Sequence, residues 1–491
     1  MPQISVIGAG FAGMAASTVL AAEGCDVTIY EKHNTPGGRA RKFEAQGFVY
    51  DMGPSWYWMP DVFEQYFARF GKKVSDYYEL ERLDPSYRIF FGPNDYWDLP
   101  ATMGDLLSFF EKEEPGSSEQ LKIFLNEGAY KYNVGIKSMA YNPGVSLLEL
   151  CRIDLLKGIT RLHVFQSVSS YIRKYFKSER LIQLLEFPVL FLGASPSETP
   201  ALYSLMNYAD MSLGTWYPTG GMNKIAEAMV KLAEEKGVKF RFNSTIDRLT
   251  VSGPKVKSLV INGAEVPTDY VVAGADYRHV DRDLLPHRFS NYDEPYWQKR
   301  KLAPSSLIFY LGINKRLKNL LHHNLFFDED FELHTNEIYT NPMWPTNPLF
   351  YVCCPSKTDA SVAPAGMENL FILVPVAPGL EDEASIREKY ATIILDRLEK
   401  LTGQAIKQHI VYQRSYAHKD FIADYNAFKG NAYGLANTLL QTANLKPSIV
   451  NKKLSNLFYT GQFTVPGPGV PPSLISGQIV ADELIKRKLK N

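Results

Sequence analysis

The first forty residues constrain this chain more than any other segment. Apolar runs predict strands over 4–7 and 27–30, and Gly8-Ala9-Gly10-Phe11-Ala12-Gly13 follows the first of them. In such a strand–turn–helix unit, the first glycine permits the turn, the second lets the backbone approach a diphosphate, and the third lets helix and strand pack closely. An acidic residue, Glu31, follows Gly13 at about the spacing expected for a carboxylate on a ribose. We therefore predict a dinucleotide site in an α/β fold with a parallel sheet of Rossmann type.

A second glycine pair follows the acidic residue in Pro36-Gly37-Gly38-Arg39-Ala40. This pair can bring another backbone segment to the same phosphates, and Arg39 supplies a forked cation for them. The alternative is a surface turn with an exposed arginine. No further G-x-G-x-x-G follows a predicted strand, so the sequence gives no indication of a separate NADPH domain.

The charge balance excludes one class of partner. The chain has 53 basic and 53 acidic residues and no formal net charge, which makes nucleic acid a poor candidate. The nine histidines show no H-x-x-H or H-E-x-x-H spacing, so we expect no metal site. The four cysteines form no C-x-x-C pair, which favours reduced thiols and a cytoplasmic location.

The dinucleotide-binding elements are spread along the chain. Strands ending at a glycine are predicted near 270–273 and 457–460, and a C-terminal helix is predicted from about 473 to 489. We expect one cofactor domain assembled from discontinuous segments, and an α+β substrate domain whose part over 100–200 is mostly helical. The expected cofactor-domain segments are 1–80, 216–300 and 431–491, and the substrate-domain segments are 81–215 and 301–430.

Four blocks in order carry a family resemblance. Besides the N-terminal block, they are Gly53-Pro54-Ser55, then Trp216-Tyr217-Pro218-Thr219-Gly220-Gly221, and Gly461 with Pro466-Gly467-Pro468-Gly469-Val470-Pro471-Pro472. Together they resemble the bacterial-type carotenoid desaturases, the group of phytoene desaturase and 1-hydroxycarotenoid 3,4-desaturase. The glycine blocks alone also fit the wider FAD-dependent amine-oxidase-like superfamily, and the last two blocks narrow the resemblance.

The resemblance implies FAD as the cofactor and assigns residues to it. Ile246 is expected to offer its backbone to the adenine, with Asp276 nearby, and Gln462 stands where the superfamily often has an acidic residue. The residues expected near the adenosine, diphosphate and ribityl parts are Gly8, Gly10, Ala12, Gly13, Glu31, Gly38, Arg39, Ala40, Ser55 and Trp56. Those expected at the flavin end are Gly461, Gln462, Val470 and Pro471.

The implied reaction is the introduction of a C=C bond next to the polyene of an acyclic carotenoid, with a 1-hydroxylated substrate and 3,4-desaturation favoured over phytoene. An amine or protoporphyrinogen oxidase, or a non-enzymatic prenyl-lipid carrier, remains an alternative. Quinone or dioxygen is the expected electron acceptor. Residues 56–58 (Trp-Tyr-Trp) are expected to wall an apolar channel, or else to pack in the core.

Two further predictions concern the middle of the chain. Glu149 and Arg152 lie three residues apart on a predicted helix and so share one of its faces. We expect them to act as an acid/base pair in catalysis, or else to form an ordinary surface ion pair. Apolar residues recur at helical spacing over 152–180 among many basic ones, which predicts an amphipathic helix on a membrane surface, or else a helix with a buried face.

Overall fold

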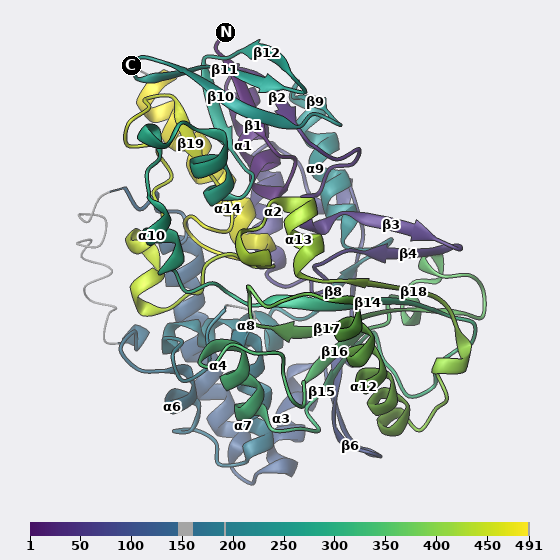
Figure 1. Cartoon of the computed structure of the whole chain (residues 1–491). Coiled ribbons are helices and arrows are strands. Elements are labelled where there is room, and N and C mark those ends of the chain that lie inside the picture. Colours follow the sequence, from purple (N-terminus) through teal and green to yellow (C-terminus); the bar gives the residue numbers. More distant parts are fainter. Residues whose placement is uncertain (146–160, 191–192, 490–491) are drawn as a thin grey trace.

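The computed structural model describes residues 1–145, 161–190 and 193–489, and two large sheets dominate them (Figure 1). The first sheet has five parallel strands in the order β19-β13-β1-β2-β9. Its strands are β1 (Gln3–Ile7), β2 (Asp26–Tyr30), β9 (Lys239–Arg241), β13 (Tyr270–Ala273) and β19 (Leu457–Tyr459).

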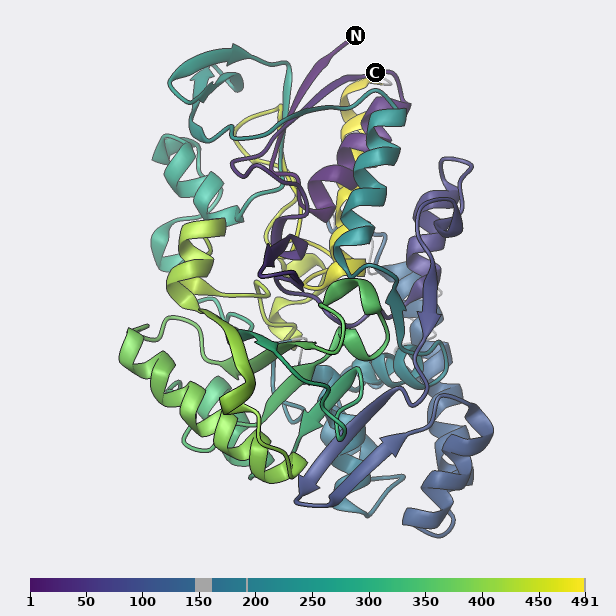
Figure 2. The same cartoon turned by 90° about the vertical axis from the view of Figure 1, so that its right-hand side faces the viewer.

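Helices cover one face of this sheet and a small antiparallel sheet covers the other. The helices are α1 (Phe11–Ala22), α9 (Asn223–Glu235) and α14 (Val470–Leu484), which lie side by side in Figure 2. Val6 and Ile29 pack with these helices, whereas Ile7 and Ala273 pack with the antiparallel sheet. That sheet consists of β10 (Ile246–Ser252), β11 (Lys255–Ile261) and β12 (Ala264–Pro267).

The second large sheet has seven strands in the order β18-β14-β17-β16-β15-β6-β7, and only the β15–β6 pair is parallel. Its strands are β6 (Tyr87–Gly92), β7 (Asp95–Leu99), β14 (Ser305–Ile313), β15 (His323–Phe326), β16 (Phe350–Cys353), β17 (Glu368–Val376) and β18 (Ile410–Tyr416). Helix α12 (Ala384–Thr402) packs on one face through Ile394 and Leu398.

The sequence of strand β14 is a nearly continuous apolar run, and its position in the sheet explains why. Every residue from Ser305 to Ile313 is buried. Leu307 and Phe309 face α12, while Ile308 and Tyr310 face the main core on the other side. Successive side chains of a strand point to opposite faces, so a strand covered on both sides is buried at every position and is mostly apolar.

The remaining elements are helices and two short antiparallel strand pairs. The helices of the part below the second sheet in Figure 1 are α3 (Met103–Glu113), α4 (Ser117–Val134), α6 (Val168–Ile172), α7 (Glu179–Leu190) and α8 (Leu205–Met211). The others are α2 (Pro60–Ala68), α10 (Glu294–Gln298), α11 (Phe331–Tyr339) and α13 (His418–Tyr425). The short pairs are β3 (Lys42–Ala45) with β4 (Phe48–Asp51), and β5 (Leu80–Arg82) with β8 (Trp216–Pro218).

The prediction of one amphipathic helix over 152–180 is wrong for its described part, 161–180. Residues 161 and 162 are helical, turns follow at 163–165, and the short helix Val168–Ile172 is separate from α7, which begins at Glu179. Leu162, Val168 and Ile172 are buried and contribute to the core, whereas Phe165 of the same pattern is 85% exposed. Residues 152–160 lie outside the described residues.

The C-terminal helix begins three residues earlier than predicted. The sequence suggested a start near residue 473 because two prolines precede it, but α14 starts at Val470 and includes both. Proline fits the first turn of a helix because the first N–H groups need no partner within the helix. The helix N-terminus is thereby placed directly after Gly469, beside the cavity described below.

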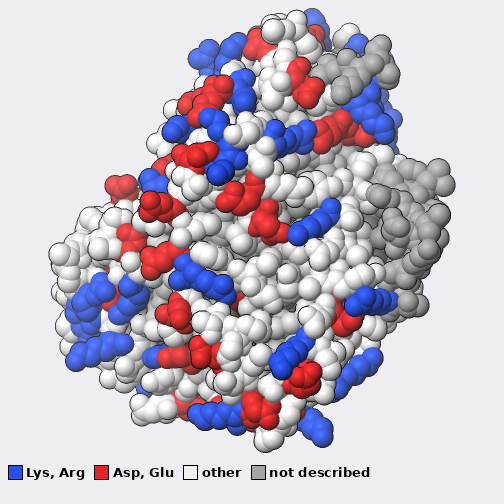
Figure 3. All heavy atoms as spheres, turned by 180° about the vertical axis from the view of Figure 1, so that it is seen from behind, with Lys and Arg blue, Asp and Glu red and all other residues white. Residues whose placement is uncertain are grey.

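None of the helices in the described residues is both long and apolar enough to cross a bilayer. The rear face of the molecule carries basic and acidic side chains interspersed, as Figure 3 shows. This mixture agrees with the balanced net charge and gives that face no continuous basic track.

Candidate functional site

One large cavity lies between the two main sheets, at the carboxyl ends of β1, β2, β13 and β19. Ligands of open parallel sheets bind at this edge. The cavity brings together segments that are far apart in the sequence. The predicted site residues that line it are Gly8, Gly10, Ala12, Glu31, Gly38, Arg39, Ala40, Ser55, Trp56, Ile246, Asp276, Gly461, Gln462, Val470 and Pro471.

Gly13 does not line the cavity and has a different role. A Cβ at this position would lie 2.1 Å from the carbonyl oxygen of Gly8. Residue 13 must therefore be glycine for α1 to pack against the preceding turn. Glu149 and Arg152 lie outside the described residues.

The backbone near Gly10 leaves room for a ligand. A Cβ on Gly10 would meet no protein atom within 4 Å, and Gly10 caps α1 without a side-chain hydrogen bond. The second glycine pair lies against this turn, because Gly37 N donates to Ala9 O at 2.8 Å and a Cβ on Gly38 would come within 3.2 Å of Gly10 Cα. A helix N-terminus with uncapped N–H groups and a glycine cradle fits a diphosphate.

Glu31 is held firmly at the end of β2. Its Oε2 accepts a hydrogen bond from Ala9 N at 2.8 Å, and its Oε1 accepts one from His33 N at 2.9 Å. These bonds orient the carboxylate beside the glycine turn. Each carboxylate oxygen has a second lone pair, so Glu31 can still accept hydrogen bonds from ribose hydroxyls.

Arg39 and Asp276 bring opposite charges to the same cavity. Nε of Arg39 is buried without a hydrogen-bond partner among the described residues, and the guanidinium lies 4.9 Å from the centre of the Tyr425 ring. Burial raises the pKa of Asp276, and the Arg39 guanidinium opposes that rise. A buried guanidinium nitrogen without a partner, in a cavity with a diphosphate cradle, indicates that an anionic group completes the site.

The C-terminal block lines the cavity directly beside the glycine turn, since a Cβ on Gly461 would lie 3.9 Å from Ala12 Cβ. Gly461 has a φ of +109°, which favours glycine, and its N–H donates to Ser476 Oγ at 3.0 Å. The amide of Gln462, which stands where an acidic residue is common, donates to Asn431 Oδ1 at 3.3 Å. Gln462 thereby links this block to the 431–434 loop. The N-termini of both α1 and α14 face the cavity, and both favour negative charge on a ligand.

The cavity continues onto the inner face of the seven-stranded sheet. Ile308, Leu373 and Tyr351 are paired across β14, β17 and β16 and form one row that lines it. Burial raises the pKa of Tyr351 far above its usual value and that of Tyr433 to about 12, so both lining phenols stay protonated. This row was not predicted from the sequence, because it depends on how three separate strands pair.

The three side chains of the segment 56–58 point in different directions, two into the cavity and one into the core. Trp56 and Trp58 line the cavity, as predicted for a channel wall. Tyr57 does not, because its ring stacks on Phe63 at 4.6 Å and its hydroxyl bonds to that of Tyr78. The segment is extended, so its middle side chain points away from its neighbours.

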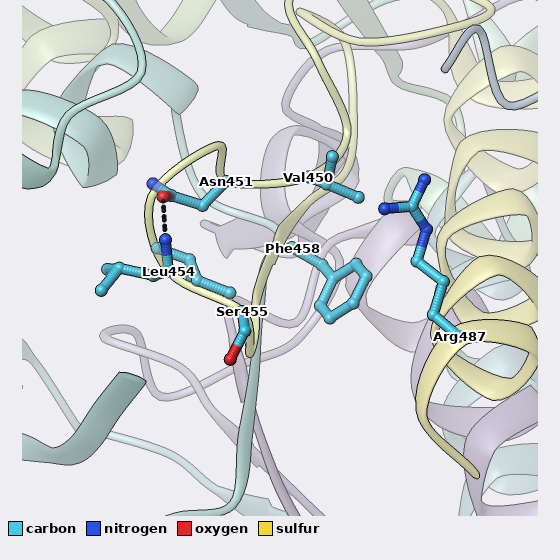
Figure 4. A pocket seen from close by; sticks show the side chains of 7 residues that line it. Val450, Asn451, Leu454, Ser455, Phe458 and Arg487 are labelled. Carbon is cyan, nitrogen blue, oxygen red and sulfur yellow. Dashed lines mark hydrogen bonds between the residues drawn. The ribbon is translucent and has the colours of Figure 1, made fainter. Parts of the chain in front are cut away.

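A second, smaller pocket lies near the C-terminal end of the chain (Figure 4). Phe458 and Arg487 face it from opposite sides, and Asn451 Oδ1 accepts a hydrogen bond from Leu454 N at 2.7 Å in the turn beside it. Its described lining residues include no glycine turn and no carboxylate. The larger cavity is therefore the candidate functional site.

Comparisons with known proteins find relatives that match almost the whole chain. The family model of flavin-containing amine oxidoreductases matches residues 11–485. A carotenoid 3,4-desaturase from Haloarcula japonica is 40% identical over 98% of this chain and 98% of its own length. A zeta-carotene-forming phytoene desaturase from Myxococcus xanthus is 31% identical over 98% of this chain and 94% of its own length.

A solved oxidoreductase from Methanosarcina mazei shares the fold, with a TM-score of 0.66 at 15% identity over 98% of this chain and 100% of that one. The diphosphate cradle, the oriented carboxylate and the unpartnered guanidinium nitrogen all suit FAD, the cofactor of the family. The chain thus belongs to the flavin-containing amine oxidoreductases and, within them, to the carotenoid desaturases.

Proposed function

We propose that this protein oxidises a C–C single bond next to the polyene of an acyclic carotenoid, at the 3,4 position of a 1-hydroxylated end group. The observation that carries the proposal is the continuity of the cofactor cradle with the apolar row Ile308, Leu373 and Tyr351 in one cavity. Support for the 3,4 position comes from the 40% identity to a carotenoid 3,4-desaturase. Phytoene desaturation is the second candidate, supported by the 31% identical relative.

The proposed binding of FAD uses the residues already described. Glu31 would hold the adenosine ribose, the backbone at Gly10 and Gly38 with Arg39 would hold the diphosphate, and the residues from Gly461 to Pro471 would hold the flavin. When bound, oxidised flavin accepts a hydride from the substrate. The substrate carbon next to the polyene can lose that hydride because the conjugated system delocalises the positive charge, and a proton then leaves the neighbouring carbon.

The chain's own contribution at the sheet face is to orient the substrate and exclude water. Ile308, Leu373 and Trp58 present apolar surface there, and the hydroxyls of Tyr351 and Tyr433 remain protonated. A proton next to a delocalised cation is acidic, so a weak acceptor suffices to remove it. The reaction therefore needs no strong protein base, and quinone or dioxygen is our proposed acceptor for the electrons.

The test is anaerobic mixing of the FAD-loaded protein with each candidate substrate. We expect a 1-hydroxylated carotenoid to bleach the flavin absorbance and to leave as a product with one more conjugated double bond, identified by chromatography. Phytoene as the preferred substrate would move the assignment to the second candidate. Bleaching by an amine or a porphyrinogen, without any carotenoid reaction, would contradict the desaturase proposal.

We also propose that the protein works at the cytoplasmic surface of a membrane, where its water-insoluble substrate resides. Several large apolar side chains of the described residues are exposed, and three of them are Phe165 at 85%, Leu440 at 76% and Leu445 at 51%. The segment 201–203 connects the chain next to Phe165 with the chain next to Leu440. Ala201 N donates a hydrogen bond to Gln166 O, and the Tyr203 hydroxyl is hydrogen-bonded to the Thr442 hydroxyl. Exposed apolar side chains of this kind can enter a lipid interface.

Vesicle flotation checks this attachment. We expect the protein to float with lipid vesicles, and the double variant Phe165→Asp/Leu440→Asp to lose most of its bound fraction. Met343→Asp is the matched control, since Met343 is 46% exposed in another region, on the loop after α11. Equal flotation of the double variant and the wild type would argue against this surface.

A further inference from the structure

Three buried side chains beside the cavity bring metal-binding atoms together. One ligand atom from each of His322, His323 and Cys353 lies within 4.8 Å of those of the other two. The three residues are only 5%, 0% and 3% exposed. His323 in β15 stands directly opposite Cys353 in β16, and opposite residues of an antiparallel pair point to the same face of the sheet. The strand register therefore fixes the approach of imidazole and thiol.

Each of the two imidazole rings is oriented by a hydrogen bond at its own Nδ1 atom. Nδ1 of His322 lies 2.8 Å from Thr358 Oγ1, and Nδ1 of His323 lies 2.6 Å from the Tyr351 hydroxyl. The Tyr351 hydroxyl donates to Ser55 Oγ at 3.0 Å, so its oxygen accepts a hydrogen bond from His323 Nδ1–H. This tautomer leaves Nε2 of His323 with a free lone pair.

The other nitrogen of each ring has no partner. Nε2 of both His322 and His323 is buried and makes no hydrogen bond to any described residue. Buried polar atoms are nearly always paired, so two adjacent exceptions call for an explanation. An imidazole held at Nδ1 by an oxygen, with Nε2 directed at a further group, is the usual arrangement of a metal-binding histidine.

The structure also provides a space next to two of the three side chains, His322 and Cys353. A small cavity of about 20 Å³ is lined by His322 and Cys353 and also by the carboxylate-bearing Asp51. This volume suffices for a single ion or water molecule.

We propose that His322, His323 and Cys353 bind one Zn²⁺ ion through the two Nε2 atoms and the thiolate. Imidazole and thiolate are the preferred ligands of zinc, and three protein ligands leave the fourth position for a water in the cavity. On binding, the Cys353 S–H bond breaks, an S–Zn bond forms, and the proton passes to solvent, so no electron transfer is involved. The ligand atoms must approach one another by about 1 Å to reach Zn–N and Zn–S distances of about 2.1 and 2.3 Å.

The proposed ion would stiffen the wall of the cofactor cavity. The indole of Trp56 stacks on the His323 ring with centres 4.1 Å apart and planes 11° apart. Ser55 is tied to the same ring through Tyr351. Both Ser55 and Trp56 line the cavity, so zinc is assigned a positioning role there and takes no part in the oxidation.

Elemental analysis of tag-free protein tests the site directly. After incubation with Zn²⁺ and desalting, we expect one zinc per chain in the wild type and less than a fifth of that in Cys353→Ser. Cys354→Ser is the matched control, because the Cys354 thiol lies 3.3 Å from Glu368 Oε2 and packs in the core on the other face of the sheet. Cys354→Ser should retain its zinc.

Cobalt provides a test that needs no variant. Co²⁺ bound in place of zinc should give the near-ultraviolet thiolate-to-metal charge-transfer band in wild type and Cys354→Ser. Zinc should also raise the melting temperature of these two proteins but not that of Cys353→Ser. A wild type that retains no zinc and shows no such band, or a Cys353→Ser variant that retains as much zinc as the wild type, would overturn the proposal. None of these readouts depends on the proposed desaturase activity.

Discussion

Gly10→Val should fold normally and lose FAD. Gly10 has φ −80° and ψ 174°, a conformation open to any residue, and its Cβ would meet no protein atom within 4 Å. The added side chain would instead occupy the space that we assign to the diphosphate. We expect affinity for FAD to fall at least ~1000-fold, or about 4 kcal/mol. The measurement is flavin absorbance per chain after gel filtration, with circular dichroism to monitor the fold.

The matched comparison is Gly13→Ala, which should act on the fold instead. A Cβ at residue 13 would collide with the Gly8 carbonyl oxygen at 2.1 Å, so α1 would have to move away from the turn. We expect this smaller substitution to lower the melting temperature and the yield of folded protein, with flavin lost only as a consequence. Full flavin content in folded Gly10→Val would refute the assignment of the diphosphate to this turn.

Leu373→Trp should keep FAD and abolish carotenoid turnover. Leu373 lies in the middle of the row with Ile308 and Tyr351, on the sheet face opposite the nucleotide cradle. An indole at this position would fill the apolar part of the cavity. We expect the turnover of carotenoid to fall roughly 100-fold, equivalent to about 2.7 kcal/mol in the activation free energy.

The readout for Leu373→Trp is product formation per bound flavin, which separates substrate access from cofactor loss. Reduction of the bound flavin by dithionite should remain unchanged, because this reductant does not need the apolar cavity. The exposed Met343→Trp substitution serves as the control for a tryptophan introduced elsewhere. If Leu373→Trp turned over carotenoid as fast as the wild type, the proposal that the substrate binds at this face of the sheet would be wrong.

Much of the cofactor site could be predicted from the sequence because its signals are local. The glycine turn, Glu31 and the second glycine pair occupy one continuous stretch of forty residues, where spacing alone constrains the geometry. Ile246, Asp276 and Gly461 are far apart along the chain, and the family resemblance linked them to that stretch. The structure brings all of them to one cavity, as expected from parallel strands whose carboxyl ends meet.

The middle of the chain was predicted less well. The spacing of apolar residues shows that a helix has an apolar face, but it does not show whether protein or lipid covers that face. The apolar residues at 162, 168 and 172 recur as on a lipid-facing helix, yet they pack in the core. Tyr57 could not be separated from its tryptophan neighbours by composition, since only the extended backbone turns it toward Phe63.

By itself, the sequence predicted the cofactor class and the family through four motif blocks, and it suggested the glycine turn that we propose for the diphosphate through residue types at short, fixed spacings. Only the tertiary structure decided how residues of different strands meet. The row of Ile308, Tyr351 and Leu373, and the approach of His323 to Cys353, follow from strand register. Register is set by pairing between segments that are tens of residues apart, and shifting it by one residue would turn every side chain to the other face.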